Sequence, residues 1–416
     1  MSRFVAFSHR DFRLLWAGNT FSGIGSAMQV TAISWHVFEL LRGQETIVSL
    51  FGRDITLGIE ALGLGGLGLA RILPIIVFAL FGGMLADTID RRRLMIMAET
   101  GSMFVAGTLA VLTFSGNESI VWLYVLTATG SATRAFVNPA QQSLVPNLVP
   151  RHHLTNAISL NVLSTYGANV VGPALAGLLV SKFGLGVVYS LDTASFAAVL
   201  VGLILIRFRG QLPATGGLGW TGMKEGLRFT FGNRIIWSTM LLDFIATFFS
   251  SARTLLPIVA EDVLKVGVQG YGYLVAAQPV GAVLAGTYLS LRQDVKRQGV
   301  LLLLSVAIFG LATALFGLST LFALSFFLFA VTGAADTLSA VIRGTIRQLT
   351  TPDELRGRMT GINMMFFMGG PQLGEVEAGI VAAALGAPFA IVSGGVITVL
   401  LTGWIAWRYP RLRRYE

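Results

Sequence analysis

The sequence contains little charge. Asp, Glu, Lys and Arg make up 12% of its 416 residues, whereas hydrophobic residues make up 54%. Soluble domains carry about 25% charged residues, so most of this surface cannot face water. No domain-sized stretch of ordinary soluble composition separates the apolar segments, which excludes a soluble protein. The chain also lacks cysteine, which leaves its redox compartment open.

The motifs of common soluble enzymes are absent or misplaced. No lysine follows a glycine, which excludes a phosphate-binding P-loop and therefore an ATP-driven pump within this chain. The four histidines form no zinc-hydrolase motif, and we expect no metal and no cofactor. Residues 63–68 match the dinucleotide fingerprint inside an apolar segment, so we interpret their glycines as helix-packing residues. We therefore expect neither an enzyme nor a nucleic-acid-binding protein.

Long apolar blocks recur along the whole chain, each near the roughly 20 residues that a helix needs to cross a bilayer. Clusters of Gly, Pro and charge separate them. The blocks predict helices at residues 12–40, 62–86, 94–114, 119–142, 156–180, 186–206, 235–260, 270–291, 300–318, 320–349, 359–385 and 388–407. The first block is too long for a cleavable signal peptide and carries Asn19 and Gln29.

Basic residues test this layout, because Lys and Arg are retained in cytoplasmic loops. If both termini are cytoplasmic, most of the 30 basic residues fall on the cytoplasmic side, including Arg91 to Arg93, Arg207, Arg209, Lys224, Arg228, Lys296, Arg297, Arg356, Arg358 and Arg411 to Arg414. Within helices we place Arg71, Arg134 and Arg253. The pattern predicts a multi-pass protein of the plasma (inner) membrane with cytoplasmic termini, and the net charge of +9 is a topology signal.

The two halves of the chain resemble each other weakly. The segment that begins at Gly130 has a counterpart that begins at Gly333, which indicates internal duplication. We predict an all-α membrane protein with twelve transmembrane helices in two pseudo-symmetric six-helix bundles, residues 1–206 and 234–416. Residues 207–233 are predicted to form a cytoplasmic linker with an amphipathic helix, because apolar and charged side chains alternate there at helical spacing.

Residues 82–93, after the second predicted helix, read Gly-Gly-Met-Leu-Ala-Asp-Thr-Ile-Asp-Arg-Arg-Arg. They resemble the signature Gly-x-Leu-Ala-Asp-Arg-x-Gly-Arg-Lys of the major facilitator superfamily, with Thr88 and Asp90 in place of the usual Arg and Gly. An aspartate at a helix end can pair with arginines only while the cytoplasmic side is closed, which suits a gate. The expected gating residues are Gly83, Asp87, Arg91, Arg92 and Arg93. The arginines could equally serve only to anchor the topology.

Residues 167–177, Gly-Ala-Asn-Val-Val-Gly-Pro-Ala-Leu-Ala-Gly, are similar to the antiporter motif of drug exporters in this superfamily. Small residues spaced by four give a flat helix face, and a proline inside the helix favours a bend. The resemblance implies that Gly167, Gly172, Pro173 and Gly177 bear on closure between the two halves.

Residues 134–140 and 351–358 resemble the branch of the superfamily that includes enterobactin exporters and macrolide efflux proteins. The resemblance covers nearly the whole chain except residues 43–60. That insertion is either an external flap or an unimportant loop extension.

Ionisable residues inside membrane helices are the best pointers to function, since each costs at least a few kcal/mol unless it is paired, hydrated or neutralised. Asp243 lies nine residues past Arg234, roughly 14 Å along its helix and near the bilayer middle. It is the first candidate for proton coupling, with Asp336, Glu375 and Glu377 as the others. Glu375 and Glu377 point roughly 200 degrees apart and cannot both face one cavity.

In the superfamily that this chain resembles, the first, fourth, seventh and tenth helices line a central cavity. The candidate residues for a substrate cavity are Arg134, Asp243, Asn138, Gln29 and Asn19. Any of the buried charges could instead form a static ion pair between helices, and this is our interpretation of Arg71, Glu99, Asp192 and Arg253.

These features predict a monomeric, proton-coupled exporter of amphiphilic small molecules, such as drugs or siderophore-like compounds, that works by alternating access amid membrane lipid. A lipid or lysophospholipid translocator of the same fold is the alternative within transport. A non-transporting membrane scaffold or receptor would leave the buried charges unexplained.

Overall fold

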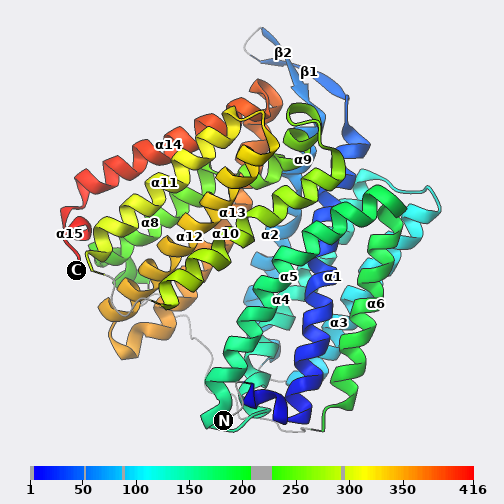
Figure 1. The fold of residues 1–416 in the computed structure, drawn as a ribbon, viewed down its shortest axis with the longest axis vertical. Coiled ribbons are helices and arrows are strands. Elements are labelled where there is room, and N and C mark those ends of the chain that lie inside the picture. The colour runs from blue at the N-terminus through cyan, green and yellow to red at the C-terminus, as the bar shows by residue number, and fades with distance from the viewer. Residues whose placement is uncertain (1–3, 51–52, 87–89, 208–226, 292–295) are drawn as a thin grey trace. The chain divides into compact units, whose positions relative to one another are not determined.

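The computed structural model describes residues 4–50, 53–86, 90–207, 227–291 and 296–416. Within them lie twelve long helices: α1 (Arg10–Leu41), α2 (Ile59–Ala86), α3 (Arg91–Phe114), α4 (Ile120–Leu144), α5 (Leu154–Phe183), α6 (Leu185–Leu205), α8 (Arg234–Phe249), α10 (Gly267–Ser290), α11 (Gln298–Leu318), α12 (Phe322–Thr350), α13 (Asp353–Leu385) and α14 (Ala387–Arg408). Where the connections between them are described, they consist of short elements and turns (Figure 1). The predicted twelve helices are confirmed.

Short helical segments occupy several connections: η1 (Val5–Ser8), η2 (Val145–Asn147), η3 (Arg151–His153), η4 (Ala252–Leu255), α9 (Leu256–Ile258), the π-helical η5 (Val259–Val263) and α15 (Pro410–Arg413). The prediction carried the seventh helix unbroken to residue 260, but α8 ends at Phe249. Pro257 lies in the first turn of α9, a position at which proline is tolerated in a helix.

Ten of these helical segments are long and apolar enough to cross a membrane, judged over the described residues by length and composition. The two long helices outside that set, α1 and α13, are 32 and 33 residues long. Helix α11 has an exposed apolar face that is suited to contact with lipid. Leu304, Ile308, Leu311, Leu315 and Leu318 are exposed at a spacing of three or four, which gives one continuous apolar stripe suited to lipid.

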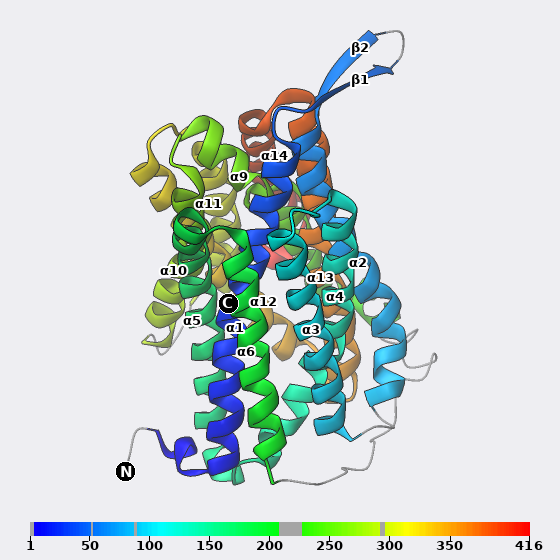
Figure 2. The ribbon, with the colours of Figure 1, turned by 90° about the vertical axis from the view of Figure 1, so that its right-hand side faces the viewer.

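The segment between α1 and α2 departs from the all-α prediction. Strands β1 (Glu45–Leu50) and β2 (Arg53–Gly58) form an antiparallel hairpin in which Glu45 pairs with Gly58. The hairpin projects from the junction of the two helices (Figure 2). Val48 and Ile55 face each other in its register, and β-branched residues favour such strands. The insertion at residues 43–60 thus contains a hairpin, and its role as an external flap or a loop extension stays a prediction.

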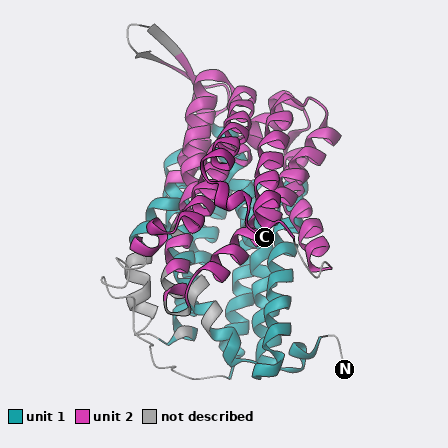
Figure 3. Cartoon of the chain, turned by 90° about the vertical axis from the view of Figure 1, so that its left-hand side faces the viewer, with its two compact units in different colours: residues 1–40, 70–217 teal, residues 41–69, 218–416 magenta. Residues whose placement is uncertain are grey.

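The chain divides into two compact units (Figure 3). The first contains residues 1–40 and 70–217, and the second contains residues 41–69 and 218–416. The hairpin and the first part of α2 therefore group with the second unit. The sequence-based division at residues 206 and 234 stays a prediction, as does the amphipathic linker helix, which falls largely at residues 208–226 outside the described structure.

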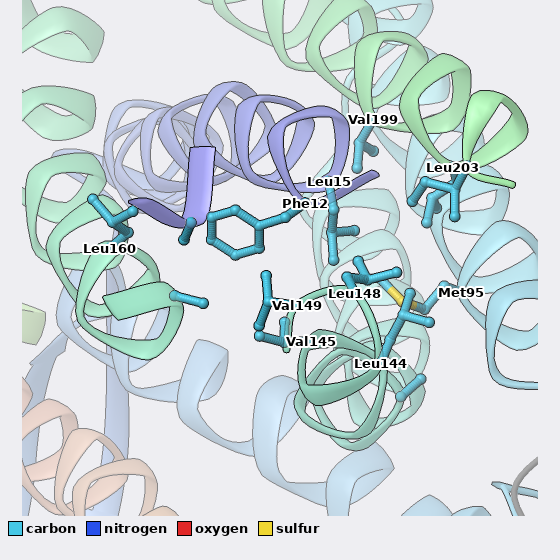
Figure 4. Packing of buried hydrophobic residues seen from close by; sticks show 14 of the residues in the cluster. Phe12, Leu15, Met95, Leu144, Val145, Leu148, Val149, Leu160, Val199 and Leu203 are labelled. Carbon is cyan, nitrogen blue, oxygen red and sulfur yellow. The ribbon is translucent and has the colours of Figure 1, made fainter. Parts of the chain in front are cut away.

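The core of the first unit gathers buried side chains from α1, α3, α4, α5 and α6 (Figure 4). Helices α1 and α6 approach closely because Gly18 and Gly202 lack side chains. A Cβ atom on Gly18 would lie 2.9 Å from the Cα of Val199, and one on Gly202 would lie 2.9 Å from the carbonyl oxygen of Leu14. Backbone contact between helices through small residues is the usual solution within a membrane.

The second unit uses the same device. Gly281 of α10 faces the backbone of Ala330 in α12, and Gly333 of α12 faces the backbone of Gln278 in α10. Gly65 of α2 faces α13, where a Cβ atom would lie 3.0 Å from the Cα of Gly379. The interpretation of the glycines at residues 63–68 as helix-packing residues is therefore confirmed at Gly65.

Candidate functional site

Asp243 is buried within the second unit, with 3% of its surface exposed, on the tenth residue of α8. Its carboxylate faces α12. Arg343 Nη2 lies 2.7 Å from Asp243 Oδ1, and Arg347 Nη2 lies 3.7 Å from Asp243 Oδ2. Both arginines are at most 5% exposed. The acid that the sequence singled out is therefore the centre of a buried charge cluster.

The charged face of α12 follows helical spacing. Asp336, Ser339, Arg343 and Arg347 occupy positions i, i+3, i+7 and i+11, which lie along one side of a helix. Arg343 Nη1 donates to Ser339 Oγ at 2.5 Å, and its Nη2 lies 3.8 Å from Asp336 Oδ1. The side chain of Asp336 is 45% exposed. Arg343 is thus shared between one buried and one accessible carboxylate.

Arg347 links three helices. Its Nε donates to Thr239 Oγ1 at 3.1 Å and its Nη2 to the backbone oxygen of Thr239 at 3.2 Å, one turn before Asp243 on α8. Its Nη1 donates to Asn363 Oδ1 on α13. Ile346 of α12 and Met240 of α8, both fully buried, pack in the neighbouring apolar clusters. This apolar surrounding strengthens the electrostatic interactions within the cluster.

Sequence reasoning missed both arginines of this cluster. The sequence analysis places only Arg71, Arg134 and Arg253 within helices, but Arg343 and Arg347 also lie inside a helix, α12, and are buried. The correction has a physical reason. Each guanidinium pairs with Asp243, and a paired charge is tolerated inside a helix bundle where a single one is not. The spacing of Asp336, Arg343 and Arg347 on one helix face was the available signal.

The two acidic candidates on α13 are half-buried and lie in different surroundings. Glu375 packs against α2, since a Cβ atom on Gly68 would lie 2.9 Å from the Cβ of Glu375. Glu377 lies two residues further along, on another face of the helix. The structure does not bring either of them into the ion pairs around Asp243.

The remaining cavity candidates belong to the first unit. Asn19 and Gln29 lie on α1, and the side-chain nitrogens of both are buried without a hydrogen-bond partner among the described residues. Arg134 lies on α4 with an exposed side chain. Asn138 is on the same helix, but its side chain is outside the described part of the structure. Their role in a substrate cavity stays a prediction.

Part of the gating motif is well defined. Gly83 lies in the last turns of α2 and Arg91 begins α3, whereas Asp87 lies outside the described residues. Asp90, which replaces the usual glycine, caps α3: its Oδ1 accepts from the backbone nitrogen of Arg92 at 2.9 Å and from that of Arg93 at 3.1 Å. A carboxylate at this position also interacts favourably with the helix dipole.

Arg92 has a second role in the first unit. Its Nε donates to the carbonyl oxygen of Leu203 at 2.7 Å and its Nη2 to that of Ile204 at 2.8 Å. These carbonyls belong to the last turn of α6, where backbone oxygens lack helical partners. Arg92 therefore caps the C-terminal end of α6. The signature motif does not indicate this role.

The antiporter motif lies on α5. Gly172, Pro173 and Gly177 are buried, whereas Gly167 has open space where a side chain would be. A Cβ atom on Gly172 would lie 2.9 Å from the carbonyl oxygen of Ile24, so this face packs against α1 within the first unit. The expected role of the motif in closure between the halves stays a prediction.

The twelve long helices, most of them apolar enough to span a membrane, are the architecture of a multi-pass membrane protein. The whole chain, residues 1–416, matches the transmembrane secretion effector family, and the protein belongs to that family. Relatives include the enterobactin exporter EntS of Shigella boydii serotype 18 and of Escherichia coli O81. Each is 26% identical over 324 residues, which cover 77% of this chain and 77% of the relative.

Solved structures of the same fold include a bacterial homologue of the iron transporter ferroportin in an inward-facing state, with a TM-score of 0.74, 14% identity and coverage of 98% of this chain and 99% of that one. A bacterial homologue of the human lysosomal transporter Spinster aligns with a TM-score of 0.72, 15% identity and coverage of 98% and 99% of the two chains. At these identities the similarity establishes the fold. The protein is therefore a multi-pass membrane transporter of the major facilitator superfamily.

Proposed function

We propose that this protein is a proton-coupled exporter of amphiphilic small molecules and works by alternating access. In this proposal it acts as a monomer in the plasma (inner) membrane, with both termini in the cytoplasm. The export direction and the siderophore-like substrate class are supported by the relatives, which are named enterobactin exporters. The weak internal duplication supports two halves that move around one site.

The proposal rests above all on the sharing of Arg343 between Asp243 and Asp336. Arg343 Nη2 lies nearer to Asp243 Oδ1 than to Asp336 Oδ1, and the negative charge of each acid attracts the same guanidinium group. A proton that binds to Asp336, the more exposed acid, removes one competitor and leaves Arg343 to Asp243. When Asp336 releases that proton, its negative charge attracts Arg343 again. Proton occupancy thereby changes the ion pairing between α8 and α12, which is the kind of two-state element that coupling requires.

Transport into everted membrane vesicles tests the proposal. Enterobactin is one probe, and ethidium is a second, amphiphilic cation without iron-chelating groups. Both should accumulate when the vesicle interior is acidic, and a protonophore should abolish the accumulation. Asp243→Asn should lose accumulation but retain exchange of the probe, whereas Asp262→Asn, at an exposed ion pair with Arg42, should behave as the unmodified protein.

Two outcomes would redirect the proposal. If Asp243→Asn accumulates either probe with normal pH dependence, the coupling role passes to Glu375 or Glu377. If the vesicles move a fluorescent lysophospholipid but neither probe, the protein is a lipid translocator of the same fold.

A further inference from the structure

A second acidic site lies in the first unit, far from the arginines of α12 in sequence. Asp192 is on α6 and is 0% exposed. It faces α1 at Gly25, where the absence of a side chain makes room for the carboxyl group. A Cβ atom on Gly25 would lie 2.5 Å from Asp192 Oδ1 and would also overlap with Ser195 Oγ. The carboxyl group is therefore enclosed between two helices.

The hydrogen bonds of Asp192 are incomplete. Ser195 Oγ lies 3.2 Å from Asp192 Oδ1, but it also lies 2.7 Å from the backbone oxygen of Asp192, and one hydroxyl proton serves both. Asp192 Oδ2 has no hydrogen-bond partner among the described residues. A buried carboxylate usually accepts several hydrogen bonds or pairs with a cation. Asp192 has neither form of compensation.

The charged groups around Asp192 come from neighbouring helices. Glu99, on α3 and itself buried, and Arg134, on α4, interact electrostatically with Asp192. On α6, Tyr189 is three residues away, and its hydroxyl lies 3.1 Å from Nδ1 of His36 on α1. Neither Asp192 nor Glu99 forms an ion pair within the described part of the chain. Our expectation of static ion pairs at both residues is therefore wrong.

The buried acids of the two units differ in whether their negative charge is compensated. Asp243 is buried with two arginines, so its ionised form is compensated. Asp192 is equally buried without such a partner, and an ionised carboxylate there costs several kcal/mol. A neutral carboxyl group avoids that cost, because its O–H needs only one acceptor.

We propose that Asp192 is a proton-binding site of the first unit. Asp192 holds a proton in the arrangement seen here, and it releases that proton when Arg134 or water reaches the carboxyl group. The O–H bond of Asp192 breaks and the proton passes to water, so charge is conserved. The inference extends the proposed proton coupling, to which it adds a second titrating site.

Infrared difference spectroscopy between acidic and alkaline pH tests the site without any substrate. The purified protein in lipid nanodiscs, with isotope-labelled aspartate, should show a band from a protonated aspartate carboxyl group. Asp192→Asn should remove that band. Asp262→Asn, which changes an exposed carboxylate, should retain it. Persistence of the full band in Asp192→Asn would overturn the inference.

Thermal unfolding provides a second measurement, which distinguishes a neutral Asp192 from an ionised Asp192 that stabilises the fold. Asparagine resembles a neutral carboxyl group, so Asp192→Asn should unfold within a few degrees of the unmodified protein. A loss as large as that of Asp243→Asn would show an ionised, stabilising Asp192 and would also overturn the inference. If Asp192→Asn expresses too poorly to measure, the conservative variant Asp192→Glu replaces it and should lose the labelled aspartate band in the same way.

The outcomes for the site and for the proposed function are distinct. Loss of the aspartate band in Asp192→Asn together with absence of gradient-driven transport in the unmodified protein would leave a proton site without coupled export. Transport with an unchanged band in Asp192→Asn would leave the export proposal intact and remove Asp192 from it.

Discussion

Arg343 Nη2 lies 2.7 Å from Asp243 Oδ1 and 3.8 Å from Asp336 Oδ1, so a single guanidinium group bridges two acids of different accessibility. The bridge joins α8 to α12 inside one unit. It stabilises the packing of these helices and supplies the competition on which the proposed coupling depends. We therefore expect loss of this contact to affect both the stability of the protein and its transport activity, and these two effects can be measured separately.

The structural expectation concerns removal of one charge from the buried cluster. Asp243→Asn leaves Arg343 and Arg347 buried without their shared carboxylate, and removal of one partner from a buried ion pair costs about 3–5 kcal/mol. We expect a markedly lower unfolding temperature for purified Asp243→Asn. Asp262→Asn, at an exposed pair, should cost less than about 1 kcal/mol. Equal unfolding temperatures for the two variants would contradict the cluster as described.

A second prediction concerns the contact of α2 with α13. A Cβ atom on Gly68 would overlap with the carbonyl oxygen of Gln372 and lie 2.9 Å from the Cβ of Glu375. Gly68→Ala should therefore destabilise the second unit by about 1–3 kcal/mol. Gly361→Ala is the matched control on α13, because no atom lies within 4 Å of the added methyl group. Thermal unfolding of both variants in detergent compares them directly, and an unchanged Gly68→Ala would exclude close packing there.

A third prediction concerns the end of α6. Arg92→Ala removes two charge-assisted hydrogen bonds to the carbonyl oxygens of Leu203 and Ile204. Hydrogen bonds to charged groups contribute about 1.5–3 kcal/mol each when buried, and less when exposed to water as here in part. We expect faster hydrogen exchange in the last turn of α6 with α3 unchanged. Arg93→Ala is the control, since the side chain of Arg93 is exposed. Similar exchange in both variants would exclude the capping role.

The fourth prediction concerns topology. The absence of cysteine makes single-cysteine labelling unambiguous. An impermeant thiol reagent should label Ile47→Cys, on the exposed face of the hairpin, from outside intact cells. It should label Arg408→Cys, at the end of α14, only after permeabilisation. The reverse pattern would invert the proposed orientation, and with it the direction of export.

How far the sequence predicts the structure depends on the kind of signal. Helices such as α11 are predicted because apolar length alone defines a membrane span. Asp243 is predicted as a site because an isolated charge in an apolar block is costly. Its partners were not predicted, because Arg343 and Arg347 lie near the end of their block and resemble loop residues there. Their spacing from Asp336 on one helix face is compatible with burial, but the contact with Asp243 on another helix is what identifies them as buried.

The acids of the first unit illustrate the opposite error. Sequence reasoning assigned Glu99 and Asp192 to ion pairs because charges in membrane helices usually pair. The partner of a charge depends on helix rotation and on small residues opposite it, such as Gly25 on α1. Neither can be read from one sequence. The hairpin at β1 and β2 was left open for a related reason, since alternation over so few residues is a weak signal.

The boundary between the two units falls inside α2, between Leu69 and Ala70. Pro74 lies four residues further along the same helix and has no backbone N–H, so the carbonyl oxygen of Ala70 loses its helical hydrogen-bond donor. A helix with one such bond missing bends at a lower cost than an intact one. Helix α2 thus runs unbroken from Ile59 to Ala86 but contains one weakened turn, and that turn begins at the first α2 residue of the first unit.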